Sequence, residues 1–431
     1  MNSSVTTDRR SIASWALYDF ANSSFTTLVV TFIYATYFTK AIAADSVSGT
    51  AQWSLAVTIT SLVVALASPY LGAIADRGGY RKRFLLISTI VVIVGSFVMF
   101  FPGPGQVLYA LTVFVIANIA FELANVFYNA YLPDLAPPDK IGRISGYGWA
   151  LGYVGGLLCM VIALFALVQV DVPPFGLDAS TGEHVRATNI LVAVWFAIFC
   201  IPMFVFVPEL QPRLVGRGDG VMTEATRQIV RTFHDIRRFR QIFRLLVARL
   251  IYNDGLVTIF AFGGIYAAGT FGFTIEEVMI FGIALNVSAG LGAYLFGFLD
   301  DRIGGKKTIL ITLVGLTFAS LLAVLTHSVA LFWTSGILVG LLVGPNQSAS
   351  RSLMGRFVPD DKETEFYGFF AFSGKATAFL GPLLLGQLTG FFGNQRFGVA
   401  IVMVFFIIGA LLTLRVDEAE GIELSGRPAR R

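Results

Sequence analysis

Charged side chains are scarce in this sequence. Asp, Glu, Lys and Arg together make up 13% of the 431 residues, whereas soluble globular proteins carry about 25%. Hydrophobic residues make up 55%. The chain has too little polar surface to cover a water-soluble particle, which excludes a cytosolic enzyme, a nucleic-acid-binding protein and a disordered scaffold. We therefore expect an integral multi-pass membrane protein whose surroundings are the lipid bilayer.

Cysteine and histidine are also nearly absent. Cys159 and Cys200 both lie in apolar runs, which excludes a disulfide framework and a structural zinc site. The histidines His184, His234 and His327 lie far apart, and no glycine-rich phosphate-binding loop ending in Lys-Ser or Lys-Thr is present. We therefore expect no metal, no other cofactor, no ATP-driven transport and no enzyme activity.

Apolar runs long enough to cross a bilayer recur along the chain. A spanning helix needs about 20 mostly apolar residues, and this rule predicts an all-α membrane protein with twelve spans. An even number of spans places both termini on the same side of the membrane. The predicted spans are residues 12–39, 51–74, 84–101, 107–131, 145–169, 189–207, 243–268, 275–299, 307–326, 329–352, 366–392 and 396–415.

Lys and Arg are distributed unequally between the two sets of loops. With both termini in the cytoplasm, 27 of the 31 basic residues fall on the cytoplasmic side. Lys40, Arg186 and Arg396 fall on the other side, and Lys375 lies within a span. Cytoplasmic loops carry an excess of Lys and Arg, so the sequence predicts cytoplasmic termini in the cell (inner) membrane.

The chain contains an internal repeat. A loop motif after the second predicted span recurs 225 residues later, after the eighth span. Internal duplication is typical of transporters that bind their solute between two halves, near the bilayer midplane. We therefore predict two six-helix bundles, at residues 1–207 and 243–431. The repeated residues are Gly72, Asp76, Arg77, Gly79, Arg81 and Lys82, which recur as Gly297, Asp301, Arg302, Gly304, Lys306 and Lys307.

Residues 208–242 join the two halves as a central cytoplasmic linker. Met222, Ala225, Ile229, Phe233 and Ile236 fall at helical spacing, and several arginines flank them. This pattern predicts an amphipathic helix that lies on the cytoplasmic leaflet. The alternative is a solvated linker whose arginines only help to orient the chain.

The repeated loop and three further stretches resemble known transporters. The loop motif, Gly-x-x-x-Asp-Arg-x-Gly-x-basic-basic, resembles that of the major facilitator superfamily. The further stretches are similar to the branch that includes the autophagy-related vacuolar amino-acid effluxers and their bacterial relatives. They are Trp15–Ser23 (WALYDFANS), Phe127–Asp134 (FYNAYLPD) with Ser145–Gly156 (SGYGWALGYVGG), and Gln347–Leu353 (QSASRSL) with Phe366–Gly368 and Gly381-Pro382.

The resemblance implies the major facilitator fold and a secondary active transporter that works by alternating access. It further implies a small polar solute, with an amino acid as the expected substrate and export as the expected direction. A drug or hydrophobic-compound exporter is the nearer alternative, and a non-transporting receptor or assembly partner is the more distant one. We expect a monomer with a small-molecule substrate and no nucleic-acid partner.

Polar side chains within the spans are the candidates for function. A charge at the centre of a spanning helix costs roughly 2.5–3.5 kcal/mol on insertion scales, so it is expected to face a cavity or a partner. The amides among these side chains could instead form interhelical hydrogen bonds, and Arg351 could reach the cytoplasmic interface. The candidates for substrate or proton binding are Asp19, Asn22, Asn118, Glu122, Asn125, Asn129, Tyr252, Asn253, Asp254, Gln347, Arg351 and Lys375.

These candidates fall on several helices. Helices 1, 4, 7 and 10 line the central cavity in the superfamily, and the resemblance implies the same here. We hypothesise that a zwitterionic solute is held between Glu122 or Asp19 and a cation, Lys375 or Arg351, and that an acidic side chain carries a coupling proton. Gly255 is expected to be a weak point of helix 7.

The repeated loops are the candidates for a cytoplasmic gate. Asp76 is expected to face the N-terminus of helix 11, and Asp301 that of helix 5, because an acid interacts favourably with a helix N-terminus. The superfamily usually has a basic residue where Tyr80 and Gly305 stand, so Arg81 and Lys306 are the nearest substitutes. The alternative is that the charged residues of these loops only set the orientation of the chain in the membrane. The gate candidates are Gly72, Asp76, Arg77, Gly79, Arg81, Gly297, Asp301, Arg302, Gly304 and Lys306.

Overall fold

The computed structural model describes residues 8–170, 172–209, 221–234 and 239–427, which form helices without any strand. Eleven helical segments in these ranges are long and apolar enough to cross a membrane. The remaining span is α4 (Arg81–Val98), an 18-residue helix that begins with three basic residues. Twelve spans result, as the apolar runs predict.

The N-terminal half supplies the first six spans. The first of them combines α1 with two π-helical segments and a short α2, and the fifth continues from α7 into a π-helical turn. The elements are α1 (Arg9–Ser24), η1 (Phe25–Phe32), α2 (Ile33–Tyr37), η2 (Phe38–Ile42), α3 (Ser46–Gly78), α4, α5 (Val107–Asn129), α6 (Leu132–Leu135), α7 (Ile141–Ala163), η3 (Leu164–Val168), η4 (Pro174–Gly176) and α8 (Glu183–Phe206).

The C-terminal half follows a separate helix, α9 (Val221–His234). It supplies the other six spans and ends in a short helix, α17. The elements are α10 (Arg240–Phe271), α11 (Ile275–Ile303), α12 (Gly305–Leu325), α13 (Val329–Phe357), α14 (Glu363–Lys375), α15 (Leu380–Phe392), α16 (Gln395–Leu414) and α17 (Glu418–Ser425).

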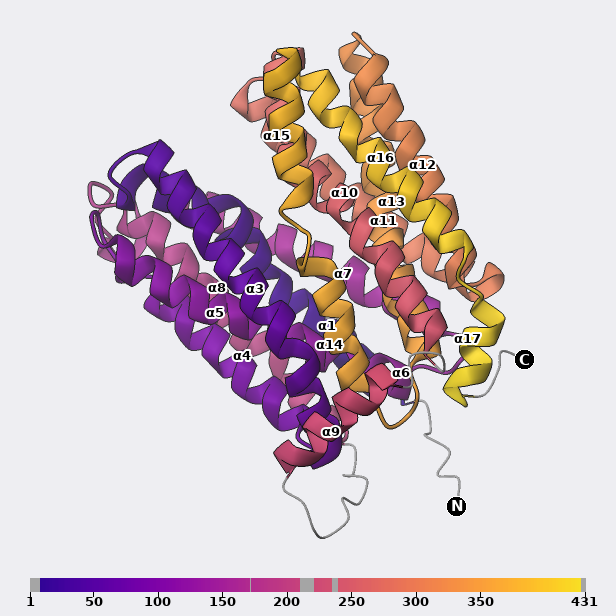
Figure 1. The fold of residues 1–431 in the computed structure, drawn as a ribbon. Helices are drawn as coiled ribbons and strands as arrows, with labels where there is room; N and C mark the ends of the chain where they lie inside the picture. The colour runs from indigo at the N-terminus through magenta and orange to yellow at the C-terminus, as the bar shows by residue number, and fades with distance from the viewer. Residues whose placement is uncertain (1–7, 171, 210–220, 235–238, 428–431) are drawn as a thin grey trace.

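Two bundles result, and each has its own apolar core. They lie close together at the end of the molecule that holds α6, α9 and α17, here called the α9 end, and diverge toward the opposite end (Figure 1). Helix α3 packs against α14, and α7 packs against α11. Glycines of both copies of the repeat permit this approach: a Cβ on Gly72 would overlap the Thr364 carbonyl, and one on Gly297 would overlap the Arg143 backbone.

The eleventh span is broken, whereas we predicted one helix over 366–392. Helix α14 ends at Lys375 and α15 begins at Leu380, so residues 376–379 are not helical. The cause is Pro382, which lacks an N–H group and whose ring would clash with the carbonyl four residues before it. Proline is tolerated in the first turn of a new helix, which is its place in α15.

Helix α10 differs from its prediction in the opposite way. It runs without interruption through Gly255, so the expected weak point is wrong. The glycine instead makes room for the ring of Phe406 on α16, which a Cβ at this position would overlap. The helix begins at Arg240, three residues before the predicted span 243–268. Arg249 lies inside the helix and is buried, although it was counted among the basic residues of the cytoplasmic side.

The predicted linker helix is present as α9, although its buried face is turned toward protein. It packs on α3, and Ala225, Gln228 and Thr232 are buried there. Met222, expected on the apolar stripe, is 65% exposed. Ile236 and the neighbouring arginines of the prediction lie outside the described residues.

Candidate functional site

An ion pair joins the two bundles within the spans. Lys375 Nζ, from α14, donates a hydrogen bond to Glu122 Oε1, from α5, over 2.7 Å. Lys375 is the last residue of α14, where the break exposes the negative end of the helix dipole, so its positive charge is stabilised. The side chains remain 18% and 31% exposed, Glu122 being the less exposed. Both side chains of this ion pair are therefore partly accessible.

A second ion pair joins the bundles closer to the α9 end. Arg351 Nη1, from α13, lies 3.0 Å from Asp19 Oδ2, from α1. The guanidinium also donates to Asn129 Oδ1 and to the hydroxyl and carbonyl oxygens of Ser145. Arg351 is 3% exposed, so the alternative in which it reaches the membrane interface is wrong.

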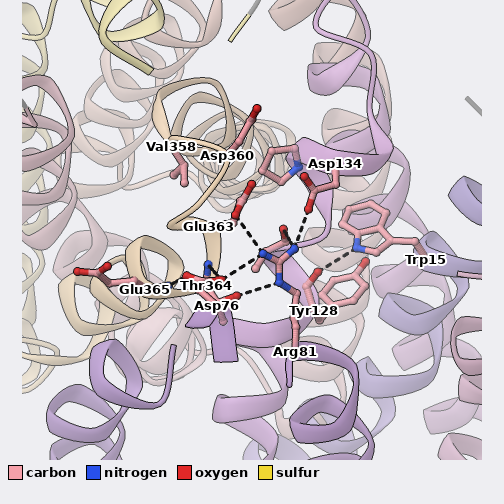
Figure 2. Close-up of polar contacts among 12 residues, drawn as sticks. Trp15, Asp76, Arg81, Tyr128, Asp134, Val358, Asp360, Glu363, Thr364 and Glu365 are labelled. Atoms are coloured by element: carbon pink, nitrogen blue, oxygen red, sulfur yellow. Dashed lines mark hydrogen bonds and ion pairs between the residues drawn. The ribbon is translucent and has the colours of Figure 1, made fainter. Parts of the chain in front are cut away.

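Aromatic rings surround this second pair. The Arg351 guanidinium lies 4.9 Å from the Trp15 ring centroid, within the range of cation–π attraction. The Trp15 indole stacks on Tyr128 and donates to the Tyr128 carbonyl over 3.1 Å (Figure 2). These contacts leave the guanidinium little freedom, so this pair is a rigid cross-bundle contact.

Three of the candidates, Asn118, Asn125 and Asn129, are asparagines of α5, and only one of them contacts an ion pair described above. Asn125 Oδ1 accepts a hydrogen bond from Asn22 Nδ2 of α1 over 3.1 Å, which joins helices of one bundle. Asn129 contacts Arg351, as described above. Asn118 is buried, and its Oδ1 has no hydrogen-bond partner among the described residues.

The candidates on α10 and α13 form a polar layer beside the broken span. Tyr252 shares a 2.8 Å hydrogen bond with Ser350. Asn253 donates to the Gly374 carbonyl over 3.0 Å and accepts from Gln347 over 3.3 Å. These contacts hold the end of α14 against both helices.

Asp254 contacts the non-helical segment of the eleventh span directly. Thr377, within the non-helical residues 376–379, donates to Asp254 Oδ1 over 3.3 Å and to the Leu250 carbonyl over 3.2 Å. Asp254 is 1% exposed. The non-helical segment is thus attached to α10 through this carboxyl group.

Arg249 is a site residue that the sequence analysis missed. Its Nη1 donates to the Phe370 carbonyl over 2.8 Å and to Ser373 Oγ over 3.0 Å. The guanidinium lies 3.7 Å from the Phe370 ring centroid. The sequence signal for a buried Arg249 was its position in an apolar run, seven residues (two helical turns) after Ile242. The other arginines nearby made this signal hard to recognise.

The first copy of the repeated loop closes the α9 end. Asp76 accepts hydrogen bonds from the Thr364 and Glu365 backbone N–H groups, over 3.1 and 2.9 Å, at the N-terminus of α14. Arg81 lies at the centre of this group (Figure 2). Its guanidinium pairs with three carboxylates and also donates to the Thr364 hydroxyl and the Ala130 carbonyl. The three carboxylates are Asp76 at 3.2 Å, Asp134 at 2.7 Å and Glu363 at 3.2 Å.

The second copy closes the same end on the other side. Asp301 accepts from the Gly142 and Arg143 backbone N–H groups, over 2.8 and 3.2 Å, at the N-terminus of α7. Arg143 Nε also lies 2.5 Å from Asp301. The neighbouring Asp300 pairs with Arg356 of α13 over 2.6 Å.

Three gate candidates lie outside these ion-pair groups. Arg77 donates to Gln228 of α9, and Arg302 is exposed. Lys306 donates to the Leu414 carbonyl over 3.0 Å rather than to Asp301, so it does not replace the basic residue that the second copy lacks. Gly79 and Gly304 adopt positive φ angles of 63° and 98°, which favour glycine.

The C-terminal helix adds residues that the loop motif did not indicate. Arg427, just after α17, pairs with Glu363 at 2.7 Å and with Asp360 at 3.0 Å, and donates to the Pro133 carbonyl over 3.0 Å. Glu418 accepts from the Gly305 backbone N–H over 3.0 Å. Among the described residues, no group of three or more His, Cys, Asp or Glu side chains could hold a metal ion.

Comparison with known proteins identifies relatives of this arrangement. The family model described as vacuole effluxer Atg22 like matches residues 40–424. The MFS-type transporter YxiO of Bacillus subtilis is 27% identical over 417 residues, which cover 96% of each chain. Autophagy-related protein 22 of Yarrowia lipolytica is 24% identical over 458 residues, which cover 86% of this chain and 75% of that protein.

Solved structures share the fold. The proton:xylose symporter XylE superposes with a TM-score of 0.74 at 16% identity, over 97% of this chain and 98% of that one. The transporter FucP, in an outward conformation, gives a TM-score of 0.72 at 12% identity, over 94% of this chain and 98% of that one. These neighbours confirm the predicted twelve-helix, two-bundle fold of the major facilitator superfamily. The relatives and neighbours are transporters rather than enzymes, as expected.

The match over nearly the whole chain and the shared fold agree with the motifs in the first, fourth and tenth spans. The protein is therefore an integral multi-pass membrane transporter of the major facilitator superfamily that belongs to the vacuole effluxer Atg22-like family.

Proposed function

We propose that this protein is a secondary active transporter that exports a small zwitterionic solute, such as an amino acid, by alternating access. The observation that carries the proposal is the Glu122–Lys375 ion pair, which joins the bundles at 2.7 Å and remains partly exposed. Opposite charges held on different bundles match the ammonium and carboxylate groups of an amino acid. The solute would replace each half of the pair with its own charged group.

The broken eleventh span supports a site at this level. Transporters often bind solutes at discontinuous helices near the midplane, between two repeats. Here Lys375 ends α14, and Arg249 and Asn253 bind carbonyl oxygens of that last turn. We propose that Lys375 receives the carboxylate of the solute and that Glu122 receives its ammonium group.

The contacts at the α9 end support a gate. Both termini and α9 would lie in the cytoplasm, since most Lys and Arg residues fall on that side, and the membrane would be the cell membrane. The bundles at 1–207 and 243–431, joined by residues 208–242, would then rock about a site near the bilayer midplane. With the α9 end closed by the groups around Arg81 and Asp301, the conformation described here would face outward.

Counterflow tests the proposal. Purified protein in liposomes preloaded with one amino acid should take up the same radiolabelled amino acid, and a panel of amino acids identifies the preferred one. Glu122→Gln and Lys375→Met should each abolish most of this uptake. The matched controls are Glu423→Gln on α17 and Lys40→Met, which change exposed side chains and should transport as the unaltered protein does. Full counterflow in both ion-pair variants would contradict the site.

A further inference from the structure

Asp254 differs from the other acidic candidates in its surroundings. Asp19 and Glu122 each pair with a cation from the opposite bundle. Asp254 is 1% exposed, and its Oδ1 accepts one hydrogen bond, from Thr377 over 3.3 Å. Its Oδ2 is buried and has no hydrogen-bond partner among the described residues. No described cation forms an ion pair with it.

The charged groups near Asp254 are engaged elsewhere. On α10 itself, Arg249 donates to α14 and Tyr252 bonds to Ser350 of α13. On α14, Lys375 is paired with Glu122 of α5.

The other neighbouring helices supply no charge at this level. On α13, Arg351 is paired with Asp19. Helix α15 has no ionisable residue, and α16 has only Arg396, in its first turn, where it binds carbonyl oxygens of residues 324 and 326. The Asp, Glu and Arg residues of α11 lie at its two ends and its Tyr294 is exposed, while α17 lies at the α9 end.

A carboxylate ion without a cation is strongly disfavoured in such an apolar interior. A protonated carboxyl group is neutral, so it avoids this penalty and can remain buried. We propose that Asp254 is the proton-binding site of the transporter and that it holds the proton in the conformation described here. This inference rests on the proposed function, because it names the coupling ion of the same transport cycle.

The break in the eleventh span places this group where the cycle can act on it. Thr377, which bonds to Asp254, lies two residues after Lys375. Gly381 packs against Thr258 and the Asp254 carbonyl, where a Cβ would overlap the Thr258 hydroxyl. The non-helical segment therefore joins Asp254 to the end of α14, which carries the cross-bundle ion pair.

This connection gives a balanced exchange of charge. When the bundles move, the Glu122–Lys375 pair separates, since its members belong to different bundles. When no solute carboxylate occupies Lys375, its freed ammonium can pair with Asp254, whose carboxyl group releases its proton to water as it becomes a carboxylate. Restoring the Glu122–Lys375 pair removes the compensating cation, and Asp254 takes up a proton again. One proton is thus carried per cycle.

Glu365 is a second buried acid without an ion-pair partner among the described residues. It is 0% exposed, and its Oε2 accepts a hydrogen bond from Gln228 of α9 while Oε1 has no partner. It lies at the N-terminus of α14, at the α9 end, far along the helix from Lys375. Any measurement of a protonated carboxyl group must therefore distinguish Asp254 from Glu365.

Infrared spectroscopy of the purified protein in lipid tests the protonation directly, without a known substrate. We expect a carbonyl stretching band of a protonated carboxylic acid at neutral pH, reduced in Asp254→Asn and displaced in frequency in Asp254→Glu. Glu122→Gln removes the carboxylate that pairs with Lys375, so the freed ammonium can pair with Asp254 and the band should decrease. Glu365→Gln should remove a separate component. A band that is identical in the unaltered protein, Asp254→Asn and Asp254→Glu would overturn the proposal.

Transport under a pH gradient tests the coupling. Asp254→Asn should reduce accumulation driven by the gradient far more than counterflow of the preferred solute, because counterflow needs no net proton movement. Asp254→Glu should restore part of that accumulation. Gradient-driven accumulation by Asp254→Asn equal to that of the unaltered protein would overturn the proposal. An absence of counterflow in the unaltered protein would contradict the proposed function instead, and the infrared result would still decide the protonation of Asp254.

Discussion

The two copies of the repeated loop form the same contact with different cations. Asp76 and Asp301 each accept two backbone hydrogen bonds from the N-terminus of a helix in the opposite bundle. In the first copy the cation comes from the motif itself, as Arg81. In the second copy Lys306 points elsewhere, and Arg143 and Arg356 supply the positive charge.

This difference shows what the repeat preserves. The aspartate and the close helix packing are retained, because a carboxylate at a helix N-terminus satisfies backbone N–H groups that would otherwise be buried without partners. The cation can come from any neighbouring helix that reaches the carboxylate. Asp76 pairs with one guanidinium, that of Arg81, whereas Asp301 pairs with two, those of Arg143 and Arg356. The copies should therefore differ in their sensitivity to substitution.

Removal of Arg81 should have the largest effect. Arg81→Ala would leave the buried Asp76 and Glu363 without this guanidinium, and loss of one partner from a buried ion pair typically costs about 3–5 kcal/mol. Thermal unfolding of the purified protein should show a large decrease in melting temperature. A melting temperature within error of the unaltered protein would contradict the central role of Arg81.

Removal of Arg143 should have a smaller effect on the second copy. Arg143→Ala would leave Asp301 with its two backbone hydrogen bonds and with Arg356 at 3.8 Å. The loss should be about 1–3 kcal/mol, the range for a buried group that loses one partner. The same thermal assay checks the order, and a larger loss than that of Arg81→Ala would reverse the comparison.

Removal of Arg427 should weaken closure at the α9 end more than it weakens the fold. Its hydrogen bond to the Pro133 carbonyl connects the C-terminal tail to the N-terminal bundle. Arg427→Ala should increase the fraction of molecules with an open α9 end. Distances between spin labels at the exposed Asp139 and Lys307 measure this fraction, and an unchanged distance distribution would show that the tail has no part in closure.

Removal of the Lys306 side chain should have the smallest effect. Its ammonium bonds to a carbonyl at the α9 end and pairs with no described carboxylate. Lys306→Ala should change stability by about 0–1 kcal/mol, as for exposed polar contacts. A loss as large as that of Arg143→Ala would show that Lys306 belongs to the second gate group after all.

Local sequence patterns predicted most of the fold. The number of spans and the two-bundle arrangement follow from apolar runs and the repeat, because the thickness of the bilayer sets the length of each span. The same patterns predicted a continuous eleventh helix, since its apolar run shows no gap. Pro382 was the available signal for the break, but proline also occurs inside unbroken helices of this protein, such as Pro69 in α3.

The candidate site was predicted less completely. Buried charge in the spans indicated that Asp19, Glu122 and Lys375 face a cavity or a partner, and each has an ion-pair partner in the other bundle. The sequence did not determine these pairings, and the role of the three residues in substrate or proton binding stays a prediction. Arg249 was missed because a basic run precedes it. It was therefore counted with the positive charges of the cytoplasmic loop, although it lies within the predicted span 243–268. Arg427 was missed because its partners come from segments far from the tail in sequence.

Composition, apolar runs and the internal repeat were enough to determine a twelve-span transporter of duplicated bundles, because those properties depend on short stretches of chain and on the bilayer. Only the packing of the bundles decided that Lys375 pairs with Glu122, that Arg351 pairs with Asp19, and that Asp254 has no cation partner in the part of the chain that the structure describes. Such pairing joins residues hundreds of positions apart, and ångström-scale differences in helix position determine which charges are neutralised.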